Sequence, residues 1–269
     1  RVGWNDEEAD KRIRWRRRKI ASIKSSFWQE FYEDIVSCFL STMEPFYDFD
    51  QTERMRMACY DAPGHRNHAE IWNHPASAED HPVYVCVVDP GQGKITRSVA
   101  QIWRVDLDAH QTLRHEATLA GKYDPESFAP LVKSLAAYYY TAKIVPEANG
   151  HGMAFCALVR DYPNLYWRTD IVSGIESKQI GWKTTGPTRI GALGTKMFAI
   201  TELQNILANL VTYDINLVRE LRQVKYSGSN VIFMGSDDYH DAAMILAATR
   251  SSISGVLPRG FIGESGYDW

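Results

Sequence analysis

Residues 83–106 read VYVCVVDPGQGKITRSVAQIWRVD, and this stretch decides the fold. Two runs rich in β-branched and aromatic residues flank a turn of proline and glycine, which predicts two antiparallel strands joined by a hairpin. A third strand is expected over residues 111–121, QTLRHEATLAG. Asp89 closes the first run, where its carboxylate lies at the end of a buried strand. Carboxylates are the side chains that hard divalent cations prefer, so Asp89 is a candidate metal ligand.

The same turn ends in Gly93-Lys94, like the tail of a phosphate-binding P-loop. A P-loop needs a glycine five residues before its Gly-Lys pair and a Ser or Thr directly after it. Val88 and Ile95 occupy those two positions. The stretch is therefore not a nucleotide phosphate loop, and we expect its glycines to let the chain reverse into the second strand.

Length, charge and cysteine spacing limit the class of protein. A chain of 269 residues can form one large domain, or one domain with an appendage. Its formal net charge of −3 argues against a protein that coats nucleic acid by uniform positive charge. The four cysteines form no C-x-x-C pair, so neither a zinc site nor a disulfide framework is predicted. The apolar runs are far shorter than the ~20 residues of a membrane span, and no signal peptide is recognised.

The order of elements predicts an α/β fold. Residues 1–24 are typical of a solvated helix, residues 25–44 have apolar residues at helical spacing, and residues 50–80 are predicted to be irregular. After the three strands come, in order, a helix from Asp124-Pro125, a strand over 143–148, a helix over 153–162, a strand over 164–169, helices over 193–210 and 215–224, a strand over 229–235 and a helix from 238. A three-strand antiparallel meander plus parallel strands means a mixed sheet flanked by helices, which fits the ribonuclease-H-like architecture.

Acidic residues recur at the ends and beginnings of these elements. Glu147 ends the strand KIVP, and Asp237, Asp238 and Asp241 open the last helix in GSDDYHDAA. Positions three and four apart share one helix face, so Asp241 lies beside both Asp237 and Asp238. Phosphodiester cleavage with two Mg²⁺ or Mn²⁺ ions needs several hard oxygen ligands around one phosphate. Together with Asp89, these acids predict such a site.

Four of these stretches in this order resemble one family, the large terminase subunit of tailed bacteriophages, in its C-terminal nuclease domain. They are VVDPGQG (87–93), VPEANGHG (145–152), IGWKTTGPTR (180–189) and GSDDYHDAAMILA (235–247). The resemblance implies an RNase-H-like endonuclease, with residues 1–48 as a helical linker or remnant of the ATPase portion and residues 49–269 as the nuclease. The family's ATPase carries Walker motifs that are not found here, so this chain is not expected to translocate DNA.

Carried over by position, the resemblance implies that Asp89, Glu147, Asp238 and Asp241 are catalytic metal ligands for two Mg²⁺ or Mn²⁺ ions. Related RNase-H-like resolvases favour a D-x-x-D pair, which selects Asp238 and Asp241 over Asp237. His240 is expected to be a hydrogen-bonding residue at the rim of the site. It is not expected to act as a general base, because in a two-metal mechanism the nucleophile comes from water bound to a metal ion.

In the turn-rich segment, Lys183, Thr185 and Arg189 are candidate contacts to DNA phosphates, with an ordinary polar hairpin as the alternative. The resemblance further implies double-stranded DNA, the ATPase domain, the small terminase subunit and the portal as partners, no membrane, and the cytoplasm of the host cell as the place of action. Two other functions remain open: an RNase-H-like resolvase or nuclease on branched DNA or hybrids, and a mainly DNA-gripping docking module with weak cleavage.

Overall fold

The computed structural model describes residues 6–23, 44–94, 96–106, 111–172, 175–190 and 194–254. The chain divides into two compact units, Arg1–Pro45 and Phe46–Trp269. In the first unit, helix α1 spans Asp6–Ile23, and most of its side chains over residues 10–19 are exposed, which confirms the solvated helix predicted there. Most of the second predicted helix, over residues 25–44, lies outside the described residues.

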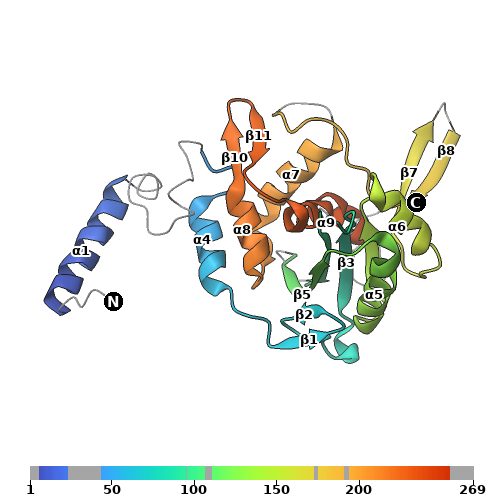
Figure 1. Cartoon of the computed structure of the whole chain (residues 1–269), viewed down its shortest axis with the longest axis horizontal. Coiled ribbons are helices and arrows are strands. Elements are labelled where there is room, and N and C mark those ends of the chain that lie inside the picture. The colour runs from blue at the N-terminus through green and yellow to red at the C-terminus, as the bar shows by residue number, and fades with distance from the viewer. Residues whose placement is uncertain are drawn as a thin grey trace, which may run out of the picture. The chain divides into compact units, whose positions relative to one another are not determined.

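A mixed sheet forms the centre of the second unit (Figure 1). Within the described residues it has seven strands, in the order β1-β2-β5-β4-β3-β6, with β9 also paired to β5. β3, β4 and β5 form the antiparallel meander, whereas β6 runs parallel to β3 and β9 parallel to β5. The strands span Gly64–Arg66 (β1), Ala69–Ile71 (β2), Val83–Asp89 (β3), Ser98–Val105 (β4), Leu113–Gly121 (β5), Lys143–Pro146 (β6) and Leu210–Val211 (β9). The predicted mixed sheet is thereby confirmed.

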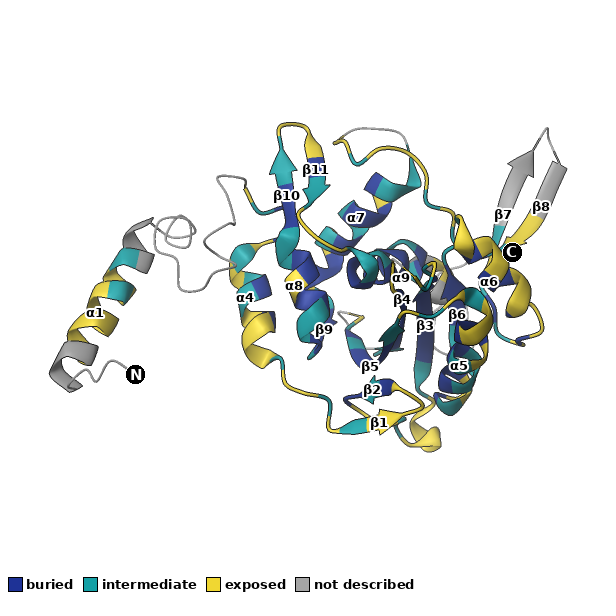
Figure 2. Cartoon of the chain, in the orientation of Figure 1, coloured by how far each residue is buried: buried dark blue, intermediate teal, exposed yellow. Residues whose placement is uncertain are grey.

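Helices cover both faces of this sheet. The alternation of side chains along β3 turns Val85 and Val87 to one face, and Cys86 and Val88 to the other. The first face packs against α7 (Thr195–Ile206), α8 (Ile215–Gln223) and α9 (Asp238–Ser254), and the second against α5 (Pro125–Tyr138) and α6 (His151–Leu158). Both faces of β3 are therefore buried, and Figure 2 shows the centre of the sheet in the colour of buried residues.

Several short elements differ from the sequence predictions. Residues 50–80, predicted to be irregular, contain α4 (Phe49–Ala58), the β1–β2 hairpin and a 3₁₀ turn, η2 (Ala78–Asp80). Two further hairpins were only half predicted: β7 (Trp167–Val172) with β8 (Ile175–Ile180), and β10 (Val224–Ser227) with β11 (Asn230–Phe233). A second 3₁₀ turn, η3 (Leu207–Asn209), follows α7. In α4 only Thr52 and Met55 are buried, so this helix leaves little periodicity to detect, and the strands of these hairpins are too short to show a clear alternation.

Phe46 and Tyr47 begin the second unit and lie inside its core, although both fall within the range 1–48 predicted as a linker. The Phe46 backbone N–H donates to the carbonyl of Val224 at 3.0 Å, and its own carbonyl accepts from Gln204 at 2.8 Å. The segment that enters this unit is therefore fixed to both α7 and β10.

The core between α5 and the sheet makes a direct stability prediction. Phe128 on α5 is fully buried and its ring contacts Phe155 of α6. Phe128→Ala removes a large buried ring and leaves a cavity, so we expect the free energy of unfolding to fall by about 3–5 kcal/mol in urea titrations. Met153→Ala on α6 is the matched control, because Met153 is 66% exposed. A similar loss in both variants would contradict this packing.

Candidate active site

Asp89 and Glu147 become neighbours because β3 and β6 are adjacent parallel strands. Val88 pairs with Pro146 in the register, and the backbone N–H of Glu147 donates to the carbonyl of Val88 at 2.8 Å. The carboxyl ends of parallel strands meet at one sheet edge, so both acids leave the sheet side by side. The chain then turns sharply into α6, where a β-carbon at Gly152 would collide with the Glu147 carbonyl.

The start of α9 brings the aspartates to the same edge. Two contacts fix this helix end: Glu220 of α8 accepts the backbone N–H groups of Tyr239 and His240 at 2.8 and 2.9 Å, and Gln101 of β4 donates to the Tyr239 carbonyl at 3.1 Å. A carboxylate that accepts the first free N–H groups of a helix acts as its cap. The cap therefore comes from a different helix, and it sets where the aspartates of α9 point.

Electrostatic coupling shows which acids converge. Burial raises the pKa of Asp89 well above its usual range, and the charges of Glu147 and Asp241, then Asp238, raise it further. Burial also raises the pKa of Glu147, with Asp241 adding to the rise. The interaction between the two carboxyl groups further raises the pKa of Asp89 and partly lowers that of Glu147, so the two groups are close neighbours. The four predicted ligands thus lie together, with Asp241 affecting each of the others.

The two remaining acids of the α9 turn differ in their surroundings. Burial raises the pKa of Asp238, as does Asp237, while Arg97 in the β3–β4 turn opposes the rise. Burial likewise raises the pKa of Asp237, and the next cause is Asp241. Asp238 and Asp241 both raise the pKa of Asp89. Asp237 and Asp241 both lie beside Lys196, which is described next.

Lys196 places a positive charge in the acid cluster, and the sequence analysis missed it. Its Nζ lies 3.4 Å from Asp241 Oδ2 and 3.7 Å from Asp237 Oδ2. Burial tends to lower the pKa of Lys196, but Asp241 and Asp237 raise it above its ordinary value, so the amine stays charged. Lys196 lies in the first turn of α7, where the helix dipole disfavours a cation. A lysine in the first turn of a predicted helix was therefore the sign in the sequence that could have identified Lys196.

The segment from Trp182 to Lys196 connects the two sides of the cluster. Asn149 donates to Glu147 Oε1 at 3.3 Å and to the Thr184 carbonyl at 2.6 Å. At the other end, the Lys196 backbone N–H donates to the carbonyl of Thr185 at 3.0 Å. Asn149 and Lys196 therefore link this segment to Glu147 and to Asp241, respectively.

The three candidate DNA contacts of this segment are all exposed. The Thr185 hydroxyl accepts the Thr195 backbone N–H at 3.3 Å, and the Lys183 carbonyl accepts the Thr195 hydroxyl at 2.6 Å. Arg189 pairs instead with Asn230 at the start of β11. Lys183 and Thr185 thus lie beside the start of α7, and Arg189 lies along the β10–β11 hairpin.

His240 is a hydrogen-bonding residue, as expected, but it is fully buried and does not lie at the rim. Its Nδ1 lies 3.4 Å from Asp241 Oδ1 and its Nε2 lies 2.6 Å from the Tyr47 hydroxyl. The sequence placed it among exposed acids, and a helix start gives no indication of which residues face inward. Burial removes His240 from direct contact with a substrate.

The donor chemistry fits a hard divalent cation. The cluster consists of carboxylates, whose mutual repulsion a cation would relieve. Cys156 lies behind Glu147, but burial raises its pKa to about 11, so it is a neutral thiol and a poor ligand. Within the part of the chain that the structure describes, no three His, Cys, Asp or Glu side chains are arranged to hold an ion as they stand.

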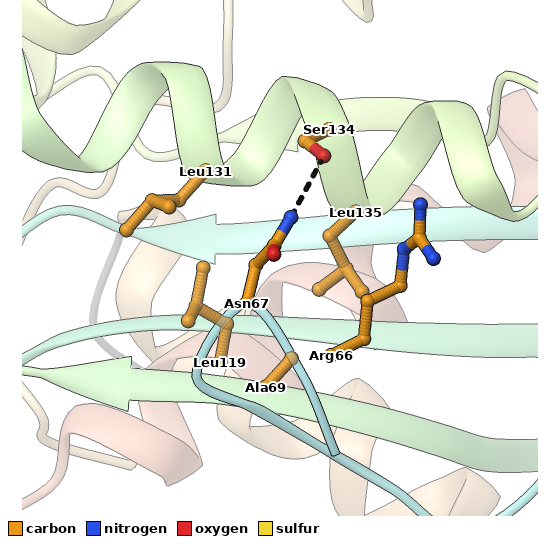
Figure 3. Close-up of a pocket in the computed structure, with 7 residues that line it drawn as sticks. All are labelled: Arg66, Asn67, Ala69, Leu119, Leu131, Ser134 and Leu135. Atoms are coloured by element: carbon orange, nitrogen blue, oxygen red, sulfur yellow. Dashed lines mark hydrogen bonds between the residues drawn. The ribbon is translucent and has the colours of Figure 1, made fainter.

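A shallow recess between the β1–β2 turn and α5 is separate from this cluster (Figure 3). Leu119, Leu131 and Leu135 contribute to its lining, and Asn67 donates to Ser134 across it at 3.4 Å. No carboxylate lines the recess. Among the described helices, none is long and apolar enough to cross a membrane.

Two solved structures share this architecture, both of the large terminase nuclease from thermophilic phage G20c. The form with bound magnesium has a TM-score of 0.52 and the form with bound cobalt a TM-score of 0.51. Each is 15% identical in sequence and covers 78% of this chain and 98% of that chain. No family model matches the chain, and no curated protein matches it in sequence. The chain therefore has the RNase-H-like fold of the large terminase nucleases, as its sequence predicts.

The raised pKa of Asp89 predicts how metal-free stability depends on pH. A carboxyl whose pKa is higher in the folded than in the unfolded state holds its proton more tightly when folded, so stability falls as the pH rises above about 4. Asp89→Asn removes this ionisation. In EDTA at pH 8 we expect its Tm to exceed that of the parent by at least about 2–4 °C, which corresponds to 1 kcal/mol, and the difference to shrink towards pH 4.

The control is Asp161→Asn, because Asp161 is an exposed carboxylate paired with Lys133 at 2.9 Å. Its pKa is lowered by the Lys133 hydrogen bond, so its substitution removes a favourable charge and is not expected to raise the Tm. A lower Tm for Asp89→Asn than for the parent in EDTA at pH 8 would show that the cluster is not under electrostatic strain.

Proposed function

We propose that this chain is a divalent-metal-dependent endonuclease that cuts double-stranded viral DNA into genome lengths during packaging. The observation that carries the proposal is the convergence of Asp89, Glu147 and Asp241 at one sheet edge, where burial and mutual charge raise the pKa of Asp89 and Glu147. Such a cluster is unfavourable without a cation. The fold shared with the G20c large terminase nuclease, one structure of which holds magnesium, supports the same function.

In this proposal Asp89, Glu147, Asp238 and Asp241 hold two Mg²⁺ or Mn²⁺ ions. The ions would supply Lewis acidity towards the scissile phosphate and its attacking water. The positive charge of the ions would offset the burial and mutual repulsion that raise the pKa of Asp89 and Glu147. Lys183, Thr185 and Arg189, all exposed on or beside the segment bound to the acids, hold the DNA backbone through charge and hydroxyl contacts.

The proposal assigns the nuclease to residues 49–269, together with Phe46 and Tyr47 of the same core, and a linking role to the rest of residues 1–48. In the complete machine, its partners would be an ATPase domain, a small terminase subunit and a portal, and it would act in the host cytoplasm. The second candidate, a DNA-gripping docking module with weak cleavage, is favoured by one observation. In the described residues the acids are not arranged to hold an ion as they stand, and Lys196 contacts Asp241 in their midst.

Cleavage assays separate these functions. With supercoiled plasmid and millimolar Mn²⁺ or Mg²⁺ we expect nicking and linearisation that EDTA stops. Loss of a group that only supports a metal ligand typically costs about 10–100-fold in activity. Asp89→Asn and Glu147→Gln each remove a proposed ligand itself, so each should reduce the cleavage rate by more than that. Asp161→Asn, the exposed carboxylate, should cut normally. Normal DNA binding by the parent without any cleavage would instead favour the docking module.

Substrate choice tests the remaining alternative. We expect linear duplex and plasmid to be cut at least as fast as a four-way junction of the same length or an RNA–DNA hybrid. A strong preference for the junction or the hybrid would identify a resolvase or an RNase H in place of a packaging nuclease.

The salt dependence of DNA binding tests the phosphate contacts. Lys183→Ala removes one exposed cation, so in fluorescence anisotropy the slope of log K against log salt should become shallower by about 0.9, the contribution of one neutralised phosphate. The loss should be the same for unrelated sequences. Lys133→Ala is the control, because Lys133 lies on α5 and is paired with Asp161. This variant should leave the slope unchanged. An unaltered slope for Lys183→Ala would exclude it from the interface.

A further inference from the structure

The two carboxylate oxygens of Asp241 have different partners. Oδ2 lies 3.4 Å from the Lys196 amine, and Oδ1 lies 3.4 Å from Nδ1 of His240. An incoming cation displaces a lysine from a carboxylate readily, because the two carry charge of the same sign. A neutral His240 ring carries no charge that would repel a cation, so its contact with Asp241 Oδ1 can persist when a cation binds at Oδ2. His240 is thus suited to orient Asp241 in both the metal-free and the metal-bound domain.

The direction of the hydrogen bonds follows from the atoms. An ionised carboxylate only accepts, so the proton of this contact lies on His240 Nδ1. In a neutral ring Nε2 is then the acceptor, and the Tyr47 hydroxyl donates to it at 2.6 Å. By donating to Nε2, the hydroxyl of Tyr47 stabilises the one neutral tautomer of His240 that can donate to Asp241. Histidine ligands and their partners are commonly fixed in this way.

Packing holds the chain of contacts from Tyr47 through His240 to Asp241, called the relay below, in place. Tyr47 is 2% exposed and His240 fully buried, so water does not compete for the 2.6 Å contact. The Phe233 ring meets the His240 ring edge to face, at 4.9 Å between centroids. The Tyr47 ring packs against Phe46 at 5.0 Å. Within the part of the chain that the structure describes, the imidazole ring has aromatic neighbours and one polar side-chain partner at each nitrogen.

We propose that Tyr47 is a positioning residue for Asp241, acting through the tautomer and orientation of His240. Tyr47 lies two residues after the division between the chain's two units, in the segment fixed to Val224 and Gln204. One hydroxyl group thus connects the entry of the nuclease unit to a carboxylate of its acid cluster. The effect on metal binding rests on the proposed function, whereas the effect on His240 does not.

The test compares two tyrosine-to-phenylalanine variants. Tyr47→Phe removes only the hydroxyl of the relay. Tyr162→Phe is the matched control, because the buried Tyr162 hydroxyl donates to the Ala142 carbonyl at 3.1 Å, in the core on the opposite face of the sheet. Two quantities are measured on the full chain: the Mn²⁺ dissociation constant by calorimetry, and the ¹⁵N shifts of the His240 ring in long-range ¹H–¹⁵N correlation spectra, assigned with His240→Gln.

Tyr47→Phe is expected to weaken Mn²⁺ binding by about 10-fold, at the lower end of the 10–100-fold range for outer partners of metal ligands. It is also expected to move the His240 shifts away from the Nδ1-protonated tautomer. Tyr162→Phe should change neither quantity, although both variants lose one buried hydrogen bond. Unchanged His240 shifts in Tyr47→Phe would overturn the proposal, as would changed shifts with wild-type Mn²⁺ affinity. If the parent itself binds no Mn²⁺, the proposed function fails and the shifts alone decide the role of Tyr47.

Discussion

Repulsion between buried carboxylates is the constraint on which the rest of this structure depends. Parallel pairing of β3 and β6 forces Asp89 and Glu147 together, and the start of α9 adds Asp241 beside them. The ammonium of Lys196, 3.4 Å from Asp241 Oδ2, supplies one compensating positive charge. The domain thus places negative charge where only a cation or a proton can compensate it, which is the property that a metal site requires.

The surrounding fold maintains this unfavourable arrangement. Glu220 and Gln101 fix the first turn of α9 from α8 and β4, and Asn149 ties Glu147 to the segment that leads to Lys196. Glu220 and Gln101 belong to a helix and a strand of the core, and Asn149 lies in the loop between β6 and α6, so the acids cannot move apart without disturbing these elements. The stability of the core thereby supports the electrostatic strain of the site, as is common where polar groups are held ready for a ligand.

The sequence predicted what local patterns determine, and it missed what only the tertiary structure determines. The β3 run, the acids at strand and helix ends and the element order predicted the mixed sheet and the group around Asp89. Lys196 and Glu220 were missed because their roles depend on neighbours far along the chain, although a lysine in a first helical turn and a glutamate on an apolar helix face were signals. His240 was expected at the rim because helix spacing alone does not show which face packs inward.

The central claim is that Asp89, Glu147 and the aspartates of α9 form one divalent-metal site. Crystals of this chain soaked in Mn²⁺ and measured at the manganese absorption edge test it most directly. The account predicts anomalous peaks within about 2.0–2.2 Å of carboxylate oxygens, with Asp89 contacting an ion shared with Glu147 or with Asp241, and Lys196 turned away from Asp241 Oδ2. A fully soaked crystal with Lys196 still at Asp241 and no peak at the cluster would contradict it.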